Sequence, residues 1–418
     1  MLAIPEFMTM RVLVVTKIFP NRDKPDGATY NRHQLRELNR VADVEVMAVI
    51  PWLPGREQLG GPPVPDVPEH DVIDGLPVTH PKALYGPAFA RPLSGMLYTA
   101  SLIPHLVSRR DDFDVVMGCF GYPDGWTAVT LGRLLGLPSV IKVHGSDVNV
   151  LGNDPMVAPR LRAAFRRADA VVGPSRALIE RAVELGADPE HARMIPNGTD
   201  RAAFRPRDRA ACRAALGESD DSRPWILFVG RLSAAKGAVD LLDAFRQVHA
   251  ARPSARLMFV GDGVDGDELR AVSERENLPV TFAGFRHPDE IPTWIGACDT
   301  LCLPSHAEGT PNVVLEALAS GRRVVTSNVG GIPDVMTDPS FGRMVPARDV
   351  PVLADALIDV LDTPYDSDVL ARRAPVVPWP VSARRLHAVL RDAVARAQSR
   401  RHPQWQRGAD ATNPPHAA

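Results

Sequence analysis

The sequence has few cysteines, no long apolar run and almost no net charge. Its four cysteines, at positions 119, 212, 298 and 302, form neither a CxxC pair nor a zinc-site spacing. This fits a reducing compartment and predicts small apolar core positions. No stretch reaches the roughly 18 uninterrupted apolar residues of a membrane-spanning helix. Because 48 basic and 50 acidic residues leave a net charge of −2, the overall charge does not favour nucleic acid.

We therefore expect a cytoplasmic protein that makes at most a peripheral contact with the inner face of a membrane. The first ten residues lack the basic and apolar regions of a secretory signal. Residues 402–418 contain three prolines and little apolar content. We expect both ends, residues 1–10 and 399–418, to be disordered.

Short β-branched runs alternate with helical stretches, which predicts parallel sheets covered by helices on both faces. Strands are predicted at residues 11–16, 44–50, 115–118, 139–144, 170–174 and 193–196, and again at 225–229, 256–260, 280–283, 300–304 and 323–327. Between these groups, residues 201–222 are polar and lack a strand pattern, so we predict a linker. The length suits two α/β domains, at residues 11–200 and 223–375.

In doubly wound sheets, ligands bind beyond the carboxyl ends of the strands. The predicted strand 225–229 is followed by GRLSAAKG, in which Arg231 and Lys236 could hold a diphosphate or simply be solvated cations. The next strand is followed by GDGVDG, a formal match to the dinucleotide fingerprint. The strand after that ends in Ala-Gly-Phe rather than in the acidic residue that binds ribose. We therefore predict a tight turn there rather than an NAD site.

The segment SHAEGTPNVVLEALASG, residues 305–321, combines a helix start with two carboxylates. Thr310 is the predicted N-cap and Pro311 the first helical residue, so unpaired N–H groups could bind an anion. Glu308 precedes the helix, whereas Glu316 lies among apolar residues, where a buried carboxylate needs hydrogen-bond partners. Sugar hydroxyls could supply them, although a lone Glu316 could equally lie on a solvated face.

These segments, in this order, resemble the retaining nucleotide-sugar glycosyltransferases of family 4, also called group 1, which include enzymes of bacterial exopolysaccharide and cell-wall glycan synthesis. The most specific element is the pair Glu308 and Glu316, with seven residues between them, in EGTPNVVLEALASG. The supporting motifs are HGSD at 144–147, PNGTD at 196–200, GRLSAAKG at 230–237, VGDG at 260–263 and SNVGGIPD at 327–334. The resemblance covers residues 11 to about 396. It implies the α/β GT-B fold, in which two doubly wound Rossmann-like domains face each other across a cleft.

The resemblance also implies roles for individual residues. Arg231 and Lys236 would bind the donor diphosphate and stabilise charge on the leaving phosphate, so no metal or other cofactor is expected. Glu316 would accept hydrogen bonds from the ribose. Glu308 would contact the transferred sugar and would not act as a nucleophile. The remaining predicted site residues are His144 for catalysis, and Gly27, Asp147, Gly230, Gly261, Asp262, Arg286, Gly309, Thr310, Pro311 and Asn312 for donor binding.

The implied reaction moves a hexose from a nucleotide diphosphate sugar to a glycan acceptor, which could be lipid-linked, with retention of the anomeric configuration. UDP-sugars are favoured over GDP-sugars. The chain departs from the family at Gly27-Ala28, where many members have a glycine pair. Three alternatives stay open: a nucleotide-sugar epimerase, a sugar-phosphate synthase on the same fold, and a non-catalytic nucleotide-sugar binding protein.

The last predicted segment, residues 376–398, contains Trp379 and would cross back to the first domain through a helix from Val381 to about Arg396. Residues 371–407 contain nine arginines and one acidic residue, so they could contact anionic lipid or form a solvated helix face. Arginines at 160, 162, 166 and 167 could contribute to the same contact. Residues 93–107 carry apolar side chains that we expect in the core or an acceptor groove, with membrane contact as the second possibility.

Overall fold

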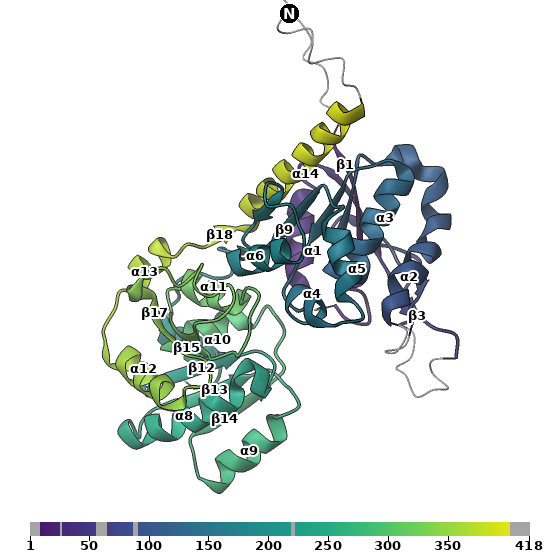
Figure 1. The fold of residues 1–418 in the computed structure, drawn as a ribbon. Helices are drawn as coiled ribbons and strands as arrows, with labels where there is room; N and C mark the ends of the chain where they lie inside the picture. Colours follow the sequence, from purple (N-terminus) through teal and green to yellow (C-terminus); the bar gives the residue numbers. More distant parts are fainter. Residues whose placement is uncertain (1–8, 26, 56–64, 87–90, 219–221, 402–418) are drawn as a thin grey trace, which may run out of the picture. The chain divides into compact units, whose positions relative to one another are not determined.

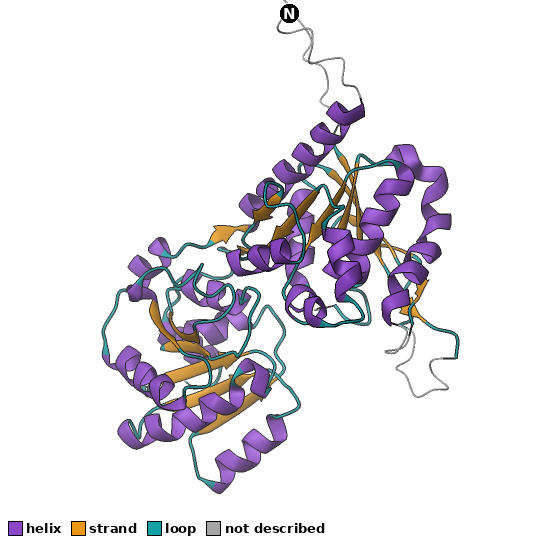
Figure 2. Ribbon diagram, viewed as in Figure 1, coloured by secondary structure: helices purple, strands orange, loops and turns teal. Residues whose placement is uncertain are grey.

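The structure, a computed structural model, describes residues 9–25, 27–55, 65–86, 91–218 and 222–401. The chain divides into two units (Figure 1). Unit 1 contains residues 1–173, 179–195 and 383–418, and unit 2 contains residues 174–178 and 196–382. The predicted disordered tails lie mostly outside the described residues. In each unit, parallel strands form a sheet with helices against it (Figure 2).

Unit 1 is built on an eight-stranded sheet in the order β10-β9-β8-β7-β1-β2-β5-β4. All neighbours are parallel except β4 and β5. Two short strands, β3 and β6, pair separately. The bounds are β1 Arg11–Thr16, β2 Asp43–Ala48, β3 Ile50–Trp52, β4 His70–Ile73, β5 Leu76–Thr79, β6 Lys82–Leu84, β7 Val115–Cys119, β8 Ser139–Lys142, β9 Ala170–Gly173 and β10 Ala192–Met194.

Alternate residues of β1 enter two different cores because successive side chains of a strand point to opposite faces. Val12 and Val14 pack with residues of α1 and α14, whereas Leu13 and Val15 pack with residues of α2 and α3. This sheet is therefore covered on both faces. The helices are α1 Thr29–Leu38, α2 Arg91–Leu106, α3 Trp126–Leu135, α4 Ser146–Asn149, α5 Ala158–Phe165, α6 Arg176–Glu184 and α14 Trp379–Arg401.

Unit 2 has a six-stranded sheet, entirely parallel, in the order β14-β13-β12-β15-β16-β17. Numbered within the unit this order is 3-2-1-4-5-6, which is the arrangement of dinucleotide-binding Rossmann domains. The bounds are β12 Trp225–Val229, β13 Arg256–Val260, β14 Val280–Gly284, β15 Thr300–Leu303, β16 Arg323–Ser327 and β17 Gly342–Val345; β11 Gly198–Thr199 pairs separately with β18 Val377–Pro378.

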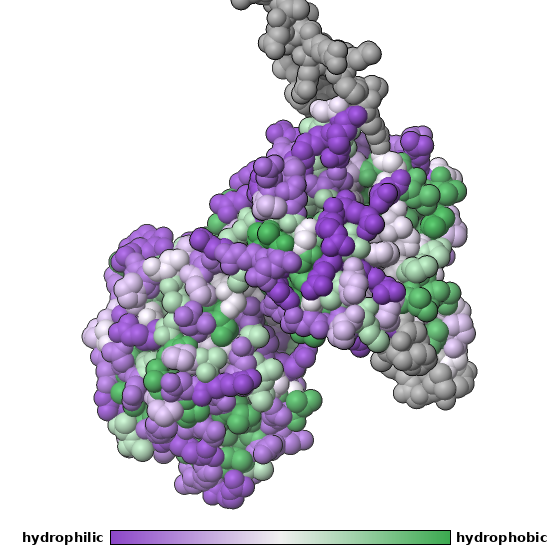
Figure 3. Space-filling view, viewed as in Figure 1, coloured by the Kyte–Doolittle hydropathy of each residue, from purple (hydrophilic) through white to green (hydrophobic). Residues whose placement is uncertain are grey.

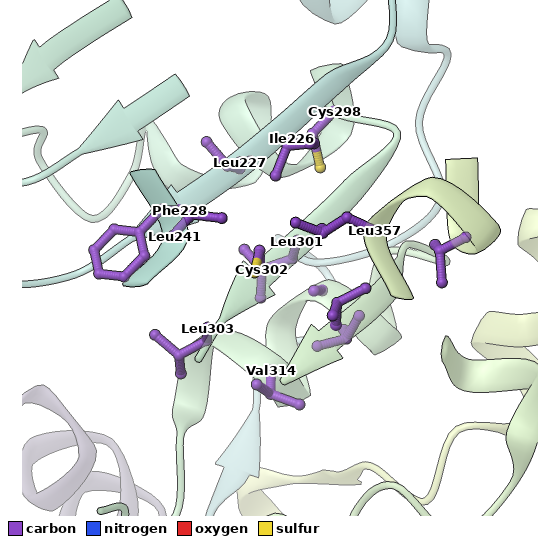
Figure 4. Packing of buried hydrophobic residues seen from close by; sticks show 14 of the residues in the cluster. Ile226, Leu227, Phe228, Leu241, Cys298, Leu301, Cys302, Leu303, Val314 and Leu357 are labelled. Atoms are coloured by element: carbon purple, nitrogen blue, oxygen red, sulfur yellow. The ribbon is translucent and has the colours of Figure 1, made fainter. Parts of the chain in front are cut away.

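The core of unit 2 forms between this sheet and its helices. Ile226 and Leu301, on neighbouring strands, are fully buried with Val314 of α11 and Leu357 of α12 (Figure 4). The helices are α7 Arg209–Ala215, α8 Ala238–Ala251, α9 Gly266–Arg275, α10 Ile291–Ala297, α11 Asn312–Ala319, α12 Val350–Asp362 and α13 Ser367–Arg373. Burial of so many apolar side chains is the main favourable term for folding of this unit.

The predicted linker, residues 201–222, is part of unit 2 rather than a connection between domains. It contains α7, whose Cys212 is buried in the unit 2 core and whose Asp208 cap accepts a hydrogen bond from the Ala211 N–H at 2.7 Å. The helix was not predicted because the segment is rich in Arg and Asp, which is typical of a linker. In the structure these residues form the helix cap and its ion pairs. One such pair joins Arg213 to Asp299 at 2.7 Å.

Candidate functional site

The switch in strand order of unit 2 falls between β12 and β15, and the predicted donor residues of this unit follow these two strands and their neighbours. Close backbone contacts link the loops. Gly261 has a φ of +129°, and a Cβ there would lie 2.0 Å from the Gly230 carbonyl oxygen. Gly237 has a φ of +73°, and a Cβ there would clash in the same way with the Pro304 carbonyl oxygen. Both positions therefore require glycine.

Lys236 and Glu308 meet at this switch point. The Lys236 Nζ atom lies 2.7 Å from Glu308 Oε1, and the Ser305 hydroxyl donates to the same oxygen at 2.7 Å. Glu308 is only 8% exposed, so the ion pair offsets the cost of burying its charge. No described residue hydrogen-bonds to Glu308 Oε2. That oxygen is therefore available to accept a hydrogen bond from a ligand.

A second contact binds the Glu308 loop to the Lys236 loop. The His306 N–H donates to the Ala235 carbonyl at 3.0 Å. His306 Nε2 lies 2.7 Å from Asp240 Oδ2, and Arg348 Nε donates to His306 Nδ1 at 3.3 Å. Because Nδ1 accepts a hydrogen bond, the ring proton is placed on Nε2, facing Asp240. His306 thus holds two loops that come from different strands.

Two glycines after β16 pack closely against the backbone of the Glu308 loop. Gly330 has a φ of +56°, and a Cβ there would lie 1.7 Å from the Glu308 carbonyl oxygen. A Cβ on Gly331 would lie 2.3 Å from the Gly309 carbonyl oxygen. The SNVGGIPD motif therefore shapes the backbone on either side of Glu308.

Arg231 is exposed and has no hydrogen bond or ion pair with any described residue. It follows β12, as does Lys236, so two cations lie on one loop and only Lys236 has a carboxylate partner. An unpaired guanidinium presents a planar set of donors suited to a phosphate group. This arrangement fits the predicted diphosphate role of Arg231, which stays a prediction.

The helix start is one residue later than expected. Pro311 occupies the N-cap position of α11 and the helix begins at Asn312. The Thr310 hydroxyl has no hydrogen-bond partner among the described residues, so the predicted Thr310 cap is wrong. The reason is that Pro311 has an extended ψ of 101°, which places it outside the helix. Its carbonyl accepts from Val314 N, which leaves the N–H groups of Asn312 and Val313 without intrahelical partners.

Glu316 lies on the same partly exposed face of α11 as Asn312, because residues four apart share a helix face. Burial raises the pKa of the Glu316 carboxyl to about 7. No described residue donates a hydrogen bond to that carboxyl. The Asn312 side-chain oxygen accepts from Asn197 Nδ2 at 2.9 Å. Among the described residues, no hydrogen bond or ion pair joins Glu316 to Lys236 or Glu308.

Asp262 and Arg286 follow β13 and β14 on the far side of β12. The exposed Asp262 carboxylate accepts from the Phe285 N–H at 2.9 Å, and its carbonyl accepts from the Leu232 N–H at 3.0 Å. The Phe285 ring is 61% exposed, and the Arg286 Nε atom is shielded without a partner among the described residues. Asp262 therefore ties three neighbouring loops together, which supports a tight turn there.

Two more predicted residues, His144 and Asp147, follow β8 in unit 1. Asp147 is fully buried and accepts backbone N–H groups from Gly121 at 2.9 Å, His144 at 3.0 Å and Gly145 at 2.7 Å. It thereby fixes the loops after β7 and β8. Burial lowers the pKa of His144 well below its ordinary value, with a further contribution from Lys142. The buried His144 Nε2 has no described partner.

Gly27, the last predicted donor residue, lies in the loop before α1. Its N–H donates to the Lys24 carbonyl at 3.2 Å. The following Ala28 has a φ of +48°, a left-handed conformation that suits glycine better than alanine. The departure from a glycine pair therefore leaves a strained residue at this loop.

Several residues at the carboxyl edges of the two sheets were not predicted as site residues from the sequence. In unit 2 these are Ser305, His306, Asp240 and Asn197. In unit 1 they are the neighbours of His144, described below. The motifs SHAEG and PNGTD contain Ser305, His306 and Asn197, but only the folded chain reveals their partners. No group of three or more His, Cys, Asp or Glu side chains suited to a metal occurs in the described part of the chain. No helix among the described residues is long and apolar enough to cross a membrane.

Comparison with known protein families identifies the family of the chain. Residues 27–198 match the glycosyl transferase 4-like domain, and residues 223–363 match the glycosyl transferases group 1 family. The Bacillus subtilis (strain 168) protein named for teichuronic acid biosynthesis, TuaC, is 28% identical over 83% of this chain and 88% of its own length. A D-inositol 3-phosphate glycosyltransferase of Segniliparus rotundus is 33% identical over 53% of each chain.

Solved structures agree on the fold. The sucrose-phosphate synthase of Thermosynechococcus elongatus superposes with a TM-score of 0.74 at 20% identity, over 93% of this chain and all of that one. Anabaena HepE in complex with UDP-glucose superposes with a TM-score of 0.66 at 20% identity, over 93% of this chain and all of its own. The two family matches and the two Rossmann-like units together define a glycosyltransferase of the GT-B class. Within that class, the chain belongs to the group 1 glycosyltransferases, family 4.

The predicted α/β GT-B fold class and the family are therefore confirmed. The role of each site residue, the donor, the acceptor, retention and metal independence stay predictions.

Proposed function

We propose that this glycosyltransferase transfers a hexose from a nucleotide diphosphate sugar to a glycan acceptor with retention and without a metal ion. UDP-sugars are the favoured donors and GDP-sugars the next. The observation that carries the proposal is the ion pair between the half-exposed Lys236 and the buried Glu308, together with the unpaired Arg231 on the same loop as Lys236. This arrangement places two cations and a carboxylate at a switch point, where Rossmann domains bind nucleotides. The UDP-glucose named with HepE supports the choice of uridine.

Each group has a chemical task in this proposal. Arg231 and the remaining Lys236 protons donate to the diphosphate, and the free N–H groups of α11 add to its binding. Glu308 Oε2 accepts from a hydroxyl of the transferred sugar, and Glu316 from the ribose. The bond between the anomeric carbon and the phosphate oxygen breaks, and its electron pair leaves with the diphosphate. The acceptor hydroxyl attacks the same face and gives its proton to a phosphate oxygen.

Glu308 is better suited to binding than to nucleophilic attack. Its Oε1 is occupied by Lys236 and Ser305, both at 2.7 Å, which fixes the carboxylate in one orientation. A carboxylate with one fixed and one free oxygen is a good acceptor for a sugar hydroxyl. This is the reason to assign it to the donor sugar.

A donor panel is the first test. Thermal unfolding is followed with UDP-, GDP-, ADP- and TDP-sugars, because a ligand that binds the folded state raises the melting temperature. We expect the largest rise with a UDP-sugar. A rise with none of the four would contradict the donor assignment.

Variants of the central pair test the site itself. Glu308→Gln and Lys236→Met should each reduce transfer at least about 100-fold, since each removes a charge-assisted contact that strengthens in the transition state. The matched controls are Glu274→Gln and Lys82→Met, which change exposed side chains. Full activity in either pair variant would reject the assignment. The anomeric configuration of the product, read by NMR, tests retention.

The acceptor could be lipid-linked, and α2 supports a peripheral contact with anionic membrane. One face of α2 is buried through Tyr98 and Leu102, while Leu93 and Met96 are 49% and 59% exposed. Figure 3 shows apolar side chains gathered over α2. The expected core position of residues 93–107 therefore holds for one face only. Exposed arginines at 162, 166, 167, 384, 385 and 391 in unit 1 could add attraction to anionic lipid.

Sedimentation with vesicles tests this contact. Binding should be stronger to vesicles that contain phosphatidylglycerol than to pure phosphatidylcholine, and should fall with salt. The double variant Leu93→Ser, Met96→Ser should weaken it. Equal recovery with both lipids, or no effect of the double variant, would contradict the membrane proposal and leave the donor assignment intact.

A further inference from the structure

The sheet of unit 1 has its own switch in strand order, between β1 and β7, and the rings of Phe120 and His144 follow β7 and β8 at its carboxyl edge. The Tyr30 and His144 ring centroids lie 5.0 Å apart, and those of Phe120 and His144 lie 6.5 Å apart at 18°. Tyr85 follows β6 nearby. We call Tyr30, Tyr85, Phe120 and His144 the aromatic edge.

Lys17 joins the aromatic edge directly after β1. Its Nζ atom lies 4.8 Å from the Phe120 ring centroid and 5.5 Å from the Tyr85 ring centroid. These are cation–π distances, so the two rings hold the ammonium from two sides. The side chain is partly buried. Its position is therefore defined by packing rather than by solvent.

The Lys17 ammonium has no hydrogen bond or ion pair with any described residue. The nearby carboxylate of Asp124 is fully buried, interacts with the Lys17 charge without an ion-pair contact, and accepts the Lys17 backbone N–H at 3.1 Å. A cation oriented by two rings retains its hydrogen-bond donors for a ligand. This distinguishes Lys17 from the exposed Lys24 in the same loop, which has no cation–π contact with a ring in the described part of the chain.

Phe120 is held in this position at a cost. Its φ of 152° is a conformation that side-chain-bearing residues rarely adopt. The adjoining Gly121 N–H is fixed by the buried Asp147, so the Phe120 backbone has little freedom to relax. The strained backbone holds the Phe120 ring where it contacts both Lys17 and His144.

We propose that the aromatic edge and Lys17 form the binding site for a glycosyl acceptor that carries a negative charge, either a phosphate or a carboxylate. The sugar ring packs on the aromatic edge, and the anionic group binds the Lys17 ammonium. The location agrees with the rule that ligands of open α/β sheets bind where the strand order reverses. This inference rests on the proposed transfer reaction and adds the chemical class of the acceptor.

Matched neutral and anionic acceptors test the proposal on the full chain. Methyl glucoside is compared with methyl glucuronide for the carboxylate, and octyl glucoside with its 6-phosphate for the phosphate. Binding is measured by saturation-transfer NMR, and transfer is measured with the donor selected by the panel. The anionic member of at least one pair should bind about tenfold more tightly or more. Which pair responds identifies the anionic group.

Lys17→Met retains the apolar stem and removes the charge. The variant should raise the KM for the anionic acceptor and so abolish the preference for it. The KM for the neutral acceptor and the Kd for the donor should stay unchanged. Lys17→Arg should retain the preference. Lys24→Met, which removes an exposed charge from the same loop, is the control and should have no effect.

Two outcomes would overturn the inference: no charge preference in either pair for the natural chain, or an equal effect of Lys17→Met on both members. Donor binding is measured on the same samples. Loss of charge preference with intact donor binding refutes the acceptor site alone, whereas a natural chain that binds no nucleotide sugar refutes the proposed function.

Discussion

Donor affinity should depend on pH through Glu316. Burial raises the pKa of this carboxyl to about 7, and no described residue donates a hydrogen bond to it. Ribose hydroxyls that donate to the carboxylate favour its ionised form, so donor binding should release a proton. Affinity should therefore rise as the pH increases through 7. Glu316→Gln cannot ionise, and it should remove this dependence.

The magnitude follows from the raised pKa. Each pKa unit corresponds to about 1.4 kcal/mol, or about tenfold in binding. At pH 6, one unit below the pKa, about one-tenth of the free protein carries the carboxylate. If the bound donor returns the pKa to its ordinary range, Kd should be about tenfold weaker at pH 6 than at pH 8.

Calorimetric titration with an intact nucleotide sugar is the suitable assay, because its esterified diphosphate does not titrate in this range. Measurements at pH 6, 7 and 8 in buffers of different ionisation enthalpy give both Kd and the protons released. Glu274→Gln, an exposed glutamate of α9, is the matched control. A change of less than twofold between pH 6 and pH 8, or an unaltered slope in Glu316→Gln, would refute the reasoning.

Two further predictions concern the loops of unit 2. Gly261→Ala should destabilise the protein by about 2–3 kcal/mol in urea unfolding, because its Cβ would lie 2.0 Å from the Gly230 carbonyl oxygen. Gly266→Ala is the control and should be near neutral, because a Cβ there has room. Equal effects of the two substitutions would contradict this prediction. His306→Ala and Asp240→Asn should each lower kcat/KM about tenfold, and the double variant should lose little more. Additive losses would show that the two side chains do not act together.

Most strands could be predicted because their apolar runs are buried on both faces. β1 and β12 are examples, and the structure places both at the predicted residues. The hairpin of β4 and β5 was missed because its side chains are half exposed, with Val72 at 70%. The turn residues Asp74 and Gly75 are the signal that could have indicated it.

The site was only partly predictable for a different reason. Arg231, Lys236 and Glu308 follow strands, so their placement at one sheet edge follows from the topology. The contacts that orient them are not local. Ser305 and His306 act on partners up to 69 residues away in the sequence. Lys17 and Phe120 likewise meet only because β1 and β7 are neighbours in the sheet.

The most direct test of the central claim compares UDP with UMP as ligands. Each charge-assisted contact contributes about 1.5–3 kcal/mol, so two cations at the diphosphate should make UDP bind at least about 100-fold more tightly than UMP. The double variant Arg231→Ala, Lys236→Met should weaken UDP binding far more than UMP binding and so bring the two affinities closer together. Equal affinities for UDP and UMP in the natural chain would contradict a diphosphate site at this switch point.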